Sequence, residues 1–226
     1  MHNIAVIGAS GAIGCALTEH LACLYPDAML TAFSRRHRTF TSPRIDSRIL
    51  NYANESEIES SAVFAAERGP LDLVIIASGL LHDDETMPEK SLRDLSGEKF
   101  LKLFAVNTVT PAIVAKHFVP RLNTDTPAIF AALSARVGSI SDNHLGGWYA
   151  YRASKAALNM VIKNLAIEAA RRNKGATIVG LHPGTVDSAL SKPFQSNVPD
   201  GKLFTPNDAA EKLCQVLTHL SPSQSG

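Results

Sequence analysis

Short apolar runs alternate with longer stretches of helical period along the chain, and no other feature limits its fold as strongly. Such alternation is typical of strand–helix–strand units, whose strands lie parallel in one sheet. Most runs are continuously apolar, which indicates strands covered by helices on both faces. The predicted strands are Ile4–Ile7, Ala28–Phe33, Arg48–Tyr52, Leu73–Ala77, Ala128–Leu133 and Thr177–His182. The predicted helices are Ala12–Leu24, Glu55–Arg68, Glu98–Leu122, Tyr149–Arg172 and a last one that starts near Asn207. The pattern predicts a single α/β domain over residues 1–226.

Two segments near the end of the chain depart from this pattern. Residues 183–206 form a loop rich in proline, glycine and serine after the sixth strand, and loops of this length are often functional lids. We expect residues 187–206 to close over a substrate. The polar segment Ser221–Gly226 is predicted to be a frayed tail.

The composition argues against several classes of protein. Hydrophobic residues make up 45% of the chain and charged residues 19%, as in folded globular proteins. A formal net charge of +1 gives no field that would attract nucleic acid or an acidic membrane. The cysteines form no CxxC pair, the histidines have no metal-ligand spacing, and no apolar run is long enough to span a bilayer. We expect a cytoplasmic protein without a metal, nucleic-acid or membrane partner.

A glycine-rich turn connects the first predicted strand to the first helix. In Gly8-Ala9-Ser10-Gly11-Ala12-Ile13-Gly14, glycine allows a sharp turn and a close approach to a pyrophosphate, whose charge the helix N-terminus favours. The residues predicted to bind a dinucleotide here are Gly8, Ser10, Gly11, Ile13 and Gly14. A glycine-rich connection without any ligand is the alternative.

The end of the second strand predicts which dinucleotide binds. About 20 residues beyond the glycine turn, NAD-binding folds carry an acidic residue for the ribose, whereas a nearby arginine accepts the phosphate of NADP. This chain has Ser34, Arg35 and Arg36 there and no carboxylate. We therefore predict NADP rather than NAD as the cofactor, with these three residues beside it. The alternative is that the arginines belong to a solvated loop.

Tyr151 and Lys155 are the candidate reacting residues. Their four-residue spacing at the start of a predicted helix places both side chains on one face, a turn apart. An ammonium group beside a phenol lowers the phenol pKa from about 10 and suits it to general acid–base catalysis. A tyrosine and a lysine also occur at this spacing by chance, so the pair alone does not establish an enzyme.

Several motifs, taken in order, resemble the short-chain dehydrogenase/reductase family. They are the glycine turn, Asn107, the segment around Ser134, the pair Tyr151 and Lys155, and Pro183-Gly184-Thr185, and together they cover nearly the whole chain. Within that family, residues 147–159 and 182–187 resemble the subgroup named for the C-factor, a bacterial cell-to-cell signalling protein. Carbonyl reductases of the sniffer type belong to the same subgroup.

The resemblance implies a doubly wound Rossmann fold whose parallel sheet of six or seven strands is flanked by helices, and assembly as a homodimer or homotetramer. It implies a catalytic set of Ser134, Tyr151, Lys155 and Asn107, in which Lys155 also holds the nicotinamide ribose and Asn107 positions a water molecule for proton relay. A polar residue that faces a neighbouring helix is the alternative for Asn107. The other residues implied at the cofactor are Asn51, Tyr52, Ala77, Ser78, Gly79, Pro183, Gly184, Thr185 and Val186. Turn or strand-end chemistry is the alternative for several of these.

One departure from the family pattern concerns catalysis directly. The family serine stands three residues before a glycine, and in Leu133-Ser134-Ala135-Arg136-Val137-Gly138 this register gives Ala135. Ser134 is one residue early, and one residue reverses a side chain on a regular strand unless a bulge intervenes. We predict Ser134 as the oxyanion partner, with Ser139 and Ser141 as further candidates. A serine that only satisfies a strand end is the alternative.

Other departures concern the scaffold. The middle glycine of the turn is shifted, and Ile76-Ala77-Ser78-Gly79 lacks the asparagine that braces the sheet in the family. No seventh strand is apparent after the last predicted helix, which predicts an exposed sheet edge.

Two functions remain open at this point. The first is an NADP-dependent oxidoreductase that moves hydride between the cofactor and a small carbonyl or alcohol, with Tyr151 as the acid. The second is an NADP(H)-binding signalling or redox-sensing protein of the C-factor type without significant turnover, which Ala135 favours. Oxidation of NADPH by a panel of aldehydes, ketones and quinones distinguishes the two.

Overall fold

The computed structural model describes residues 1–226, the side chain at position 197 excepted. Six parallel strands form one sheet in the order β3-β2-β1-β4-β5-β6. These strands are β1 (Asn3–Ile7), β2 (Met29–Ser34), β3 (Ile45–Ile49), β4 (Leu73–Ile76), β5 (Ala128–Leu133) and β6 (Ala176–Leu181). The order runs outward from β1 to β3 on one side and through β4 to β6 on the other, which confirms the predicted doubly wound parallel sheet.

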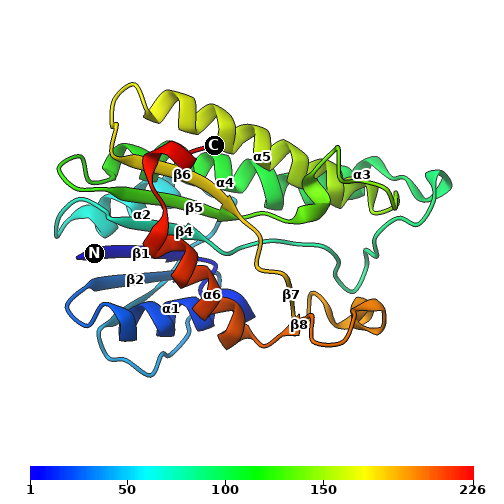
Figure 1. The fold of residues 1–226 in the computed structure, drawn as a ribbon, viewed down its shortest axis with the longest axis horizontal. Helices are drawn as coiled ribbons and strands as arrows, with labels where there is room; N and C mark the ends of the chain where they lie inside the picture. The colour runs from blue at the N-terminus through cyan, green and yellow to red at the C-terminus, as the bar shows by residue number, and fades with distance from the viewer.

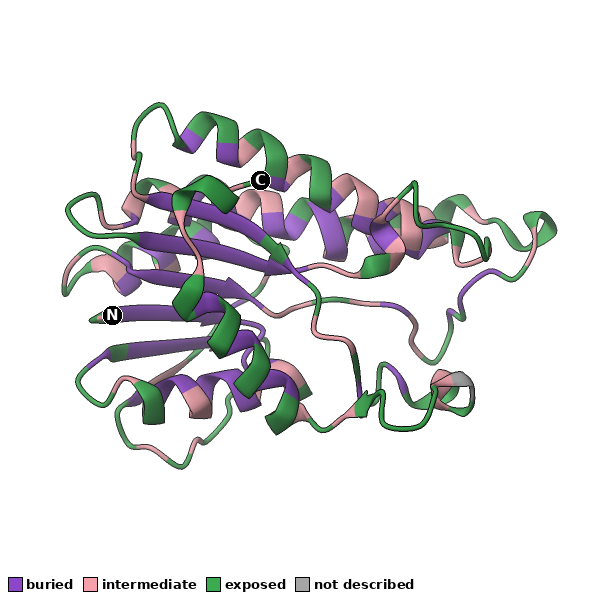
Figure 2. Ribbon diagram, in the orientation of Figure 1, coloured by how far each residue is buried: buried purple, intermediate pink, exposed green. Residues whose placement is uncertain are grey.

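Helices cover both faces of the sheet, which forms the middle of three layers (Figure 1). One face packs against α1 (Ala12–Leu24) and α6 (Pro206–His219). The other face packs against α2 (Glu55–Ala66), α4 (Thr110–Phe118) and α5 (Tyr149–Ala169). Helix α3 (Gly97–Phe104) leads into α4 and contacts α5. Figure 2 shows that the central strands are buried almost throughout, whereas the edge strand β3 is buried only at its first residue.

The continuous apolar runs arise because each strand contributes side chains to two cores. In β1, Ile4 and Val6 pack on the side of α1 and α6, whereas Ala5 and Ile7 pack on the side of α4 and α5. Successive side chains of a strand point to opposite faces, so a strand covered on both faces needs apolar residues at every position. Burial of each large aliphatic side chain contributes about 1.5–3 kcal/mol. The two cores therefore fix the sheet, and with it the position of the loops at its ends.

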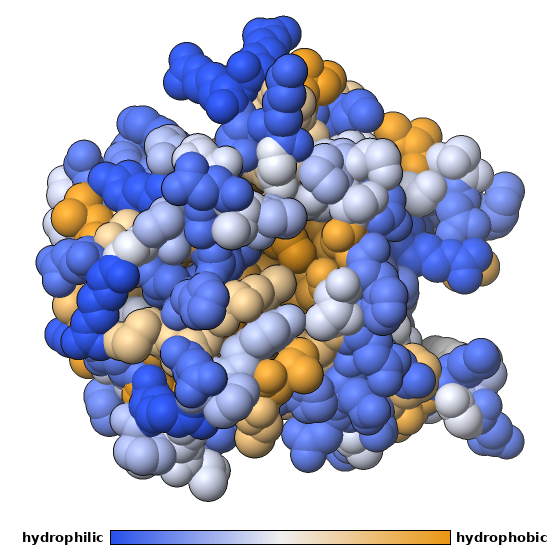
Figure 3. Space-filling model, turned by 60° about the vertical axis from the view of Figure 1, so that its left-hand side comes forward, coloured by the Kyte–Doolittle hydropathy of each residue, from blue (hydrophilic) through white to orange (hydrophobic). Residues whose placement is uncertain are grey.

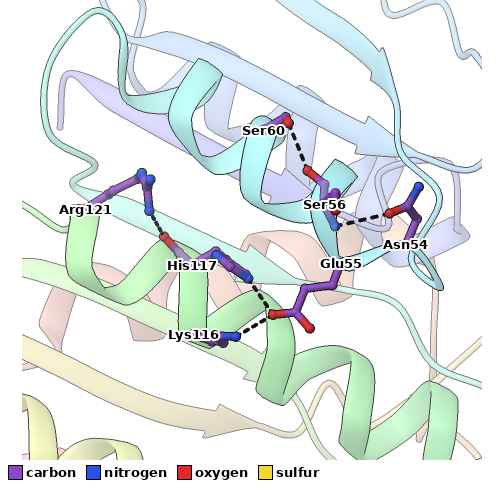
Figure 4. Close-up of polar contacts among 7 residues, drawn as sticks. All are labelled: Asn54, Glu55, Ser56, Ser60, Lys116, His117 and Arg121. Atoms are coloured by element: carbon purple, nitrogen blue, oxygen red, sulfur yellow. Dashed lines mark hydrogen bonds and ion pairs between the residues drawn. The ribbon is translucent and has the colours of Figure 1, made fainter.

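A polar cluster joins α2 to α4 (Figure 4). Glu55 Oε1 accepts hydrogen bonds from Lys116 Nζ at 2.5 Å and from His117 Nε2 at 3.0 Å. These two partners hold the pKa of the Glu55 carboxyl below its usual range. At the same end of α2, Asn54 caps the helix by accepting a hydrogen bond from Ser56 N at 3.1 Å.

The third strand begins and ends earlier than predicted. We predicted Arg48–Tyr52, but β3 pairs with β2 from Ile45 opposite Leu30 to Ile49 opposite Ser34. Because β3 is an edge strand, only part of it needs to be apolar, and its sequence carries polar and charged residues. The apolar pattern that located the central strands was therefore a poor guide to this one.

The predicted helix Glu98–Leu122 is divided into several parts. A π-helical turn, Ala105–Val109, separates α3 from α4, and a 3₁₀ turn, Val119–Arg121, follows α4. Turns of the π type interrupt helices rarely and are frequent at functional sites. This one contains Asn107, one of the predicted site residues.

The last residues lie against β6 and are not frayed as predicted. After a 3₁₀ turn, Pro222–Gln224, Gly226 N donates to Ile178 O at 2.8 Å. The hydroxyl of Ser225 accepts a hydrogen bond from Ile178 N at 2.9 Å. These contacts satisfy backbone groups of β6, so this edge of the sheet is partly covered and not bare as we expected.

Hydrophilic residues predominate on the face drawn in Figure 3, and hydrophobic residues show in a hollow near its centre and in smaller scattered patches. Among the helices that the structure describes, none combines the length and the apolar character needed to cross a membrane. No cluster of three or more histidine, cysteine or acidic side chains suited to a metal ion occurs within the described residues.

Candidate active site

The glycine turn and residues 77–79 follow the carboxyl ends of β1 and β4, two central strands of the sheet (Figure 1). In open parallel sheets, ligands bind at this edge, beside the strand where the strand order reverses. The two loops touch closely: a Cβ atom added at Gly8 would stand 2.5 Å from Ser78 N. Ala77 and Ser78 therefore lie beside the glycine turn, while the contact of residues 77–79 with a cofactor stays a prediction.

Two glycines of the turn are required by its geometry. Gly8 has a φ of +91°, in the region that other residues rarely adopt. An added Cβ at Gly14 would stand 2.2 Å from Gly8 O, so α1 can start this close to the turn only with glycine at this position. Gly11 N donates to Gly8 O at 3.1 Å and closes the turn. Ser10 and Gly11 are exposed at its tip.

The glycine turn, the end of β2 and the segment after β3 meet at one carbonyl oxygen. Phe33 O accepts hydrogen bonds from Gly8 N at 2.9 Å, Ala9 N at 3.1 Å and the Tyr52 hydroxyl at 3.3 Å. Burial raises the pKa of Tyr52 to about 12, while the Gly8 backbone and the nearby Arg35 guanidinium oppose this rise. Tyr52 is thus neutral at physiological pH and lies between the glycine turn and Arg35.

The predicted phosphate-binding residues follow directly from this junction. The Ser34 hydroxyl donates to Arg36 O at 2.6 Å and shapes the turn after β2. Arg35 and Arg36 are exposed to solvent. Their charges are thus available at the rim of the edge where the glycine turn lies.

Three features of this edge fit a dinucleotide. The first is the glycine turn itself, in which Gly8 packs against the backbone of Ser78 and Gly14 against that of Gly8 so closely that neither position has room for a side chain. The second is Ser78 Oγ, the one buried side-chain polar atom without a hydrogen-bond partner in the described part of the chain. The third is the first turn of α1, which carries no acidic residue that would repel a phosphate.

Tyr151 and Lys155 lie in the first two turns of α5 on one face. Lys155 Nζ is 5.9 Å from the centre of the Tyr151 ring and donates a hydrogen bond to Leu133 O, at the end of β5, at 2.8 Å. Both residues are buried, with 9% of Tyr151 and 3% of Lys155 exposed. An added Cβ at Gly138 would stand 2.8 Å from the backbone of Lys155, so glycine at this position lets the loop after β5 close onto α5.

The pKa values of this pair differ from the sequence prediction. Burial raises the pKa of Tyr151 to about 12 and lowers that of Lys155 to about 8. We predicted that the ammonium group would lower the phenol pKa, and for the chain by itself that direction is wrong. Loss of hydration disfavours the charged form of each group. It outweighs the attraction between the Lys155 ammonium and a Tyr151 phenolate, because the ammonium donates its hydrogen bond to Leu133 O. The phenol therefore carries its proton at neutral pH.

Asn107 is fully buried and connects the loop after β4 to α5. Its Oδ1 accepts from Leu80 N at 2.8 Å, and its Nδ2 donates to Leu80 O at 2.7 Å and to Ser154 Oγ at 3.1 Å. A Cβ atom added at Gly79 would lie 3.6 Å from Asn107 Oδ1 and 3.7 Å from Lys155 Nζ. Asn107 thus borders the site while it also contacts a neighbouring helix. Its role in a proton relay stays a prediction.

Ser134 is not brought to Tyr151. Its hydroxyl donates to Asn159 Oδ1 on α5 at 2.6 Å, and its backbone N–H continues the β5–β6 ladder to Leu181 O. Because the ladder is regular here, no bulge turns the side chain round, and Ala135 packs in the apolar cluster that contains Tyr151. The geometry does not support Ser134 as the oxyanion partner.

Ser139 and Ser141 contact each other across 3.4 Å, and Ser139 Oγ also accepts a hydrogen bond from Asp142 N. The structure thus engages both further candidates within their own loop.

The loop after β6 reaches the reacting residues through aromatic contacts. The Trp148 ring lies 6.2 Å from that of Tyr151 and 4.8 Å from that of Phe194, measured between centres. His82, in the loop after β4, stacks edge-on against Phe194, and its Nε2 lies 3.0 Å from Leu190 O. Phe194 lies within residues 187–206, the loop that we expected to close over a substrate.

The two ends of this loop pair with each other as short parallel strands, β7 (Thr185–Val186) and β8 (Leu203–Phe204). The preceding Gly184 has a φ of +76°, and an added Cβ there would stand 2.8 Å from the Phe204 ring. Pro183 to Val186 thus leave the end of β6 in a fixed direction. Their predicted contact with the cofactor stays a prediction.

Sequence reasoning missed two contacts that hold α5 at the site. Thr108 Oγ1 donates to Ser154 O at 2.8 Å, and Glu89 Oε2 accepts from Ala150 N at 3.3 Å. The loop that carries Glu89 has no motif or periodic pattern, so no signal in it marks this residue.

Comparisons with known proteins identify a matching family model and similar sequences. A family model described as short chain dehydrogenase matches residues 2–199. The chain is 29% identical to 1-hydroxy-2-glutathionyl-2-methyl-3-butene dehydrogenase of Rhodococcus sp. (strain AD45), an alignment that covers 100% of this chain and 95% of that protein. It is 31% identical to the C-signal of Myxococcus xanthus over 70% of this chain and 87% of the C-signal.

Solved structures share the fold at lower identity. The NADPH-bound carbonyl reductase from chicken fatty liver superposes with a TM-score of 0.84 at 23% identity, covering 98% of this chain and 88% of that one. The carbonyl reductase Sniffer of D. melanogaster has a TM-score of 0.85 at 20% identity, covering 100% and 94% of the two chains.

Proposed function

Because the chain belongs to the short-chain dehydrogenase family, we propose that it is an NADP-dependent oxidoreductase that acts on a small carbonyl or alcohol. The observation that carries the proposal is the buried pair of Tyr151 and Lys155 at the carboxyl edge of the sheet, next to Gly79. The NADPH bound in the chicken carbonyl reductase, which has the same fold, supports the choice of cofactor.

The protein groups proposed to hold the cofactor lie along one edge of the sheet. The glycine turn and the first N–H groups of α1 favour the pyrophosphate, and Tyr52 lies beside the adenosine half. Arg35 and Arg36 favour the additional phosphate of NADP, since a charge-assisted hydrogen bond contributes about 1.5–3 kcal/mol. When bound, NADPH supplies the hydride for reduction of a carbonyl.

Tyr151 is the proposed proton donor. Burial holds the pKa of its phenol at about 12, so the proton is present at neutral pH and can pass to a substrate oxygen. Lys155 is close enough to stabilise the phenolate that results, and an anionic group beside its ammonium would favour the charged form of the lysine. Asn107 holds the loop after β4 against α5 and so fixes the space beside Tyr151. Ala135 offers only a methyl group where the family serine stands.

Substitution of Tyr151 tests the proposal. Tyr151→Phe should lower turnover by about 10² to 10⁴, because it removes the general acid, and should leave NADPH affinity within about twofold. Turnover is followed as NADPH oxidation with aldehydes, ketones and quinones, and NADPH and NADH affinities by fluorescence. Tyr149→Phe, which makes the same change two residues earlier in α5, is the matched control and should behave as the wild type. Unchanged turnover in Tyr151→Phe would exclude the role of Tyr151, and equal affinity for NADPH and NADH would exclude the cofactor preference.

A second candidate function is favoured by Ala135 and by the similarity to the C-signal. In that case the chain binds NADP(H) for signalling or redox sensing and turns over little. Tight NADPH binding without oxidation by any member of the panel would support this alternative and reject the first.

A further inference from the structure

The N-terminus of α5 needs an acceptor from outside the helix. The first N–H groups of a helix have no partner within it, and here they belong to the turn that carries Tyr151. The residue at the N-cap position is Trp148, whose indole donates hydrogen bonds but accepts none. Trp148 also has a φ of +50° and follows Gly146 and Gly147 at +65° and +62°, a left-handed approach to the helix.

Glu89, in the loop between β4 and α3, supplies these acceptors. Its backbone carbonyl accepts from Trp148 N at 2.6 Å, and its side-chain Oε2 accepts from Ala150 N at 3.3 Å. Only 2% of Glu89 is exposed. A buried carboxylate is costly without a partner, and the positive end of a helix dipole favours it. The residue thus lies where a negative charge stabilises the start of α5.

The segment around Glu89 is itself fixed. Asp94 Oδ2 accepts hydrogen bonds from Lys90 N at 3.1 Å and Ser91 N at 2.9 Å, immediately after Glu89. Before it, Lys102 on α3 pairs with Asp83 at 2.5 Å. Gly147 approaches closely, since an added Cβ there would lie 3.4 Å from Glu89 O. Glu89 therefore contacts α5 from a segment whose own position is fixed by hydrogen bonds and an ion pair.

We propose that Glu89 is a positioning residue, which caps α5 from another segment of the chain and so keeps Tyr151 in place for proton transfer. The catalytic part of this inference rests on the proposed function, whereas the capping part does not. The loss of the cap should open the first turn of α5, where Ala150 immediately precedes Tyr151. NADPH affinity should change little, because the glycine turn and Arg35 lie in other elements and Lys155 lies one turn beyond the opened start of α5.

Two variants of Glu89 test the proposal. Glu89→Met fills similar space but offers no effective acceptor, whereas Glu89→Gln keeps an acceptor oxygen without the charge. Glu85→Met is the matched control: its side chain is 87% exposed in the same loop, where it lies 3.9 Å from Lys102. Hydrogen–deuterium exchange of the amides at residues 148–151 reports on the cap in every variant without any need for turnover. Steady-state kinetics then report kcat and the KM for NADPH.

In Glu89→Met, amide exchange at the start of α5 should be at least about tenfold faster, and kcat should fall about ten- to a hundredfold. The KM for NADPH should stay within about threefold of the wild-type value. Glu89→Gln should restore both exchange and kcat to within about threefold. Glu85→Met should match the wild type in all three measurements.

Unchanged amide exchange in Glu89→Met would overturn the proposal. A loss of kcat in Glu89→Gln with normal amide exchange would also overturn it, because Glu89 would then take part in the reaction itself. If Glu89→Met does not fold, Glu89→Ala, which removes the same acceptor without adding a bulky side chain, takes its place with the same expected faster exchange at the start of α5. If the wild type turns over no carbonyl, the proposed function fails. The exchange measurements then still show whether Glu89 caps α5.

Discussion

The N-termini of α1 and α5 both face the carboxyl edge of the sheet, but they are completed in opposite ways. At α1 the N-cap is Gly11, which has no side chain, and the first turn contains no acidic residue. At α5 a buried carboxylate, Glu89, comes from a distant segment and accepts the Ala150 N–H. No side chain caps the backbone N–H groups at the start of α1, so they can serve a ligand. At the start of α5, a carboxylate of the protein itself accepts a hydrogen bond.

This difference separates the roles of the two ends. A helix N-terminus attracts an anion, and a protein carboxylate already in place removes that attraction. The start of α1 therefore suits a phosphate. The start of α5 does not, because the carboxylate of Glu89 already accepts from Ala150 N. Under the proposed function, the start of α1 binds the cofactor and the start of α5 carries the proton donor Tyr151.

The largest expected effect concerns the buried end. Burial lowers the pKa of Lys155 to about 8, while the unfolded chain keeps it at the ordinary value of about 10.5. Between these values the unfolded state binds more protons, so the folding stability that depends on Lys155 rises with pH from about 8 to about 10.5. The shift corresponds to about 3 kcal/mol over the whole window.

Urea unfolding of the wild type and of Lys155→Met at two pH values measures this effect. Between about pH 7.5 and 9.5, the difference in unfolding free energy should change by about 2 kcal/mol in favour of the wild type, because the burial penalty of the charged lysine disappears. Both pH values lie below the range in which Tyr151, with its pKa raised to about 12, affects stability. If the difference in unfolding free energy does not vary with pH, Lys155 is hydrated in the folded protein. The burial that distinguishes the start of α5 from the start of α1 would then be absent.

The next effect concerns the open end. Gly11→Asp places a carboxylate at the N-cap of α1, and the new Cβ meets only Gly8 O, at an ordinary 3.5 Å. Stability should rise by a few tenths of a kcal/mol, since aspartate caps helices slightly better than glycine. NADPH affinity should fall about ten- to a hundredfold, because the carboxylate occupies the donors and repels the phosphate. Fluorescence titration measures the affinity, with Gly11→Asn as the uncharged control, and equal losses in both variants would argue against a charge effect.

The elements that the sequence predicted well are those whose side chains repeat a pattern. The central strands and α1, α2 and α5 are covered by packed layers, so their apolar periodicity marks them closely. The edge strand β3 has no such cover and was misplaced. The π-helical turn around Asn107 does not alter the apolar pattern, so the sequence predicted one continuous helix there.

The site was predicted where local spacing carries the chemistry and missed where distant segments meet. The glycine turn and the Tyr151–Lys155 pair are local motifs. Glu89 and Ala150 are far apart in the sequence, and their contact depends on the path of a loop without periodicity. The direction of Ser134 depended on whether β5 bulges, and the pKa of Tyr151 depended on burial, neither of which the motif shows.

The smallest expected effect uses α2 as a third helix end, whose cap at Asn54 follows the predicted cofactor residues Asn51 and Tyr52 but is made by protein groups alone. Asn54 accepts from Ser56 N (Figure 4), and Glu55 and Glu57 are acidic residues in the first turn. Asn54→Ala should lower the free energy of unfolding by about 1 kcal/mol, the usual cost of a lost cap, and leave NADPH affinity within about twofold. Thermal unfolding and fluorescence titration of the same sample measure the two quantities, with Asn54→Asp as the variant that keeps the cap. A loss of NADPH affinity in Asn54→Ala would mean that the cap of α2 also affects the cofactor site. The difference between the open start of α1 and the capped start of α5 would then not be explained by their local carboxylates alone.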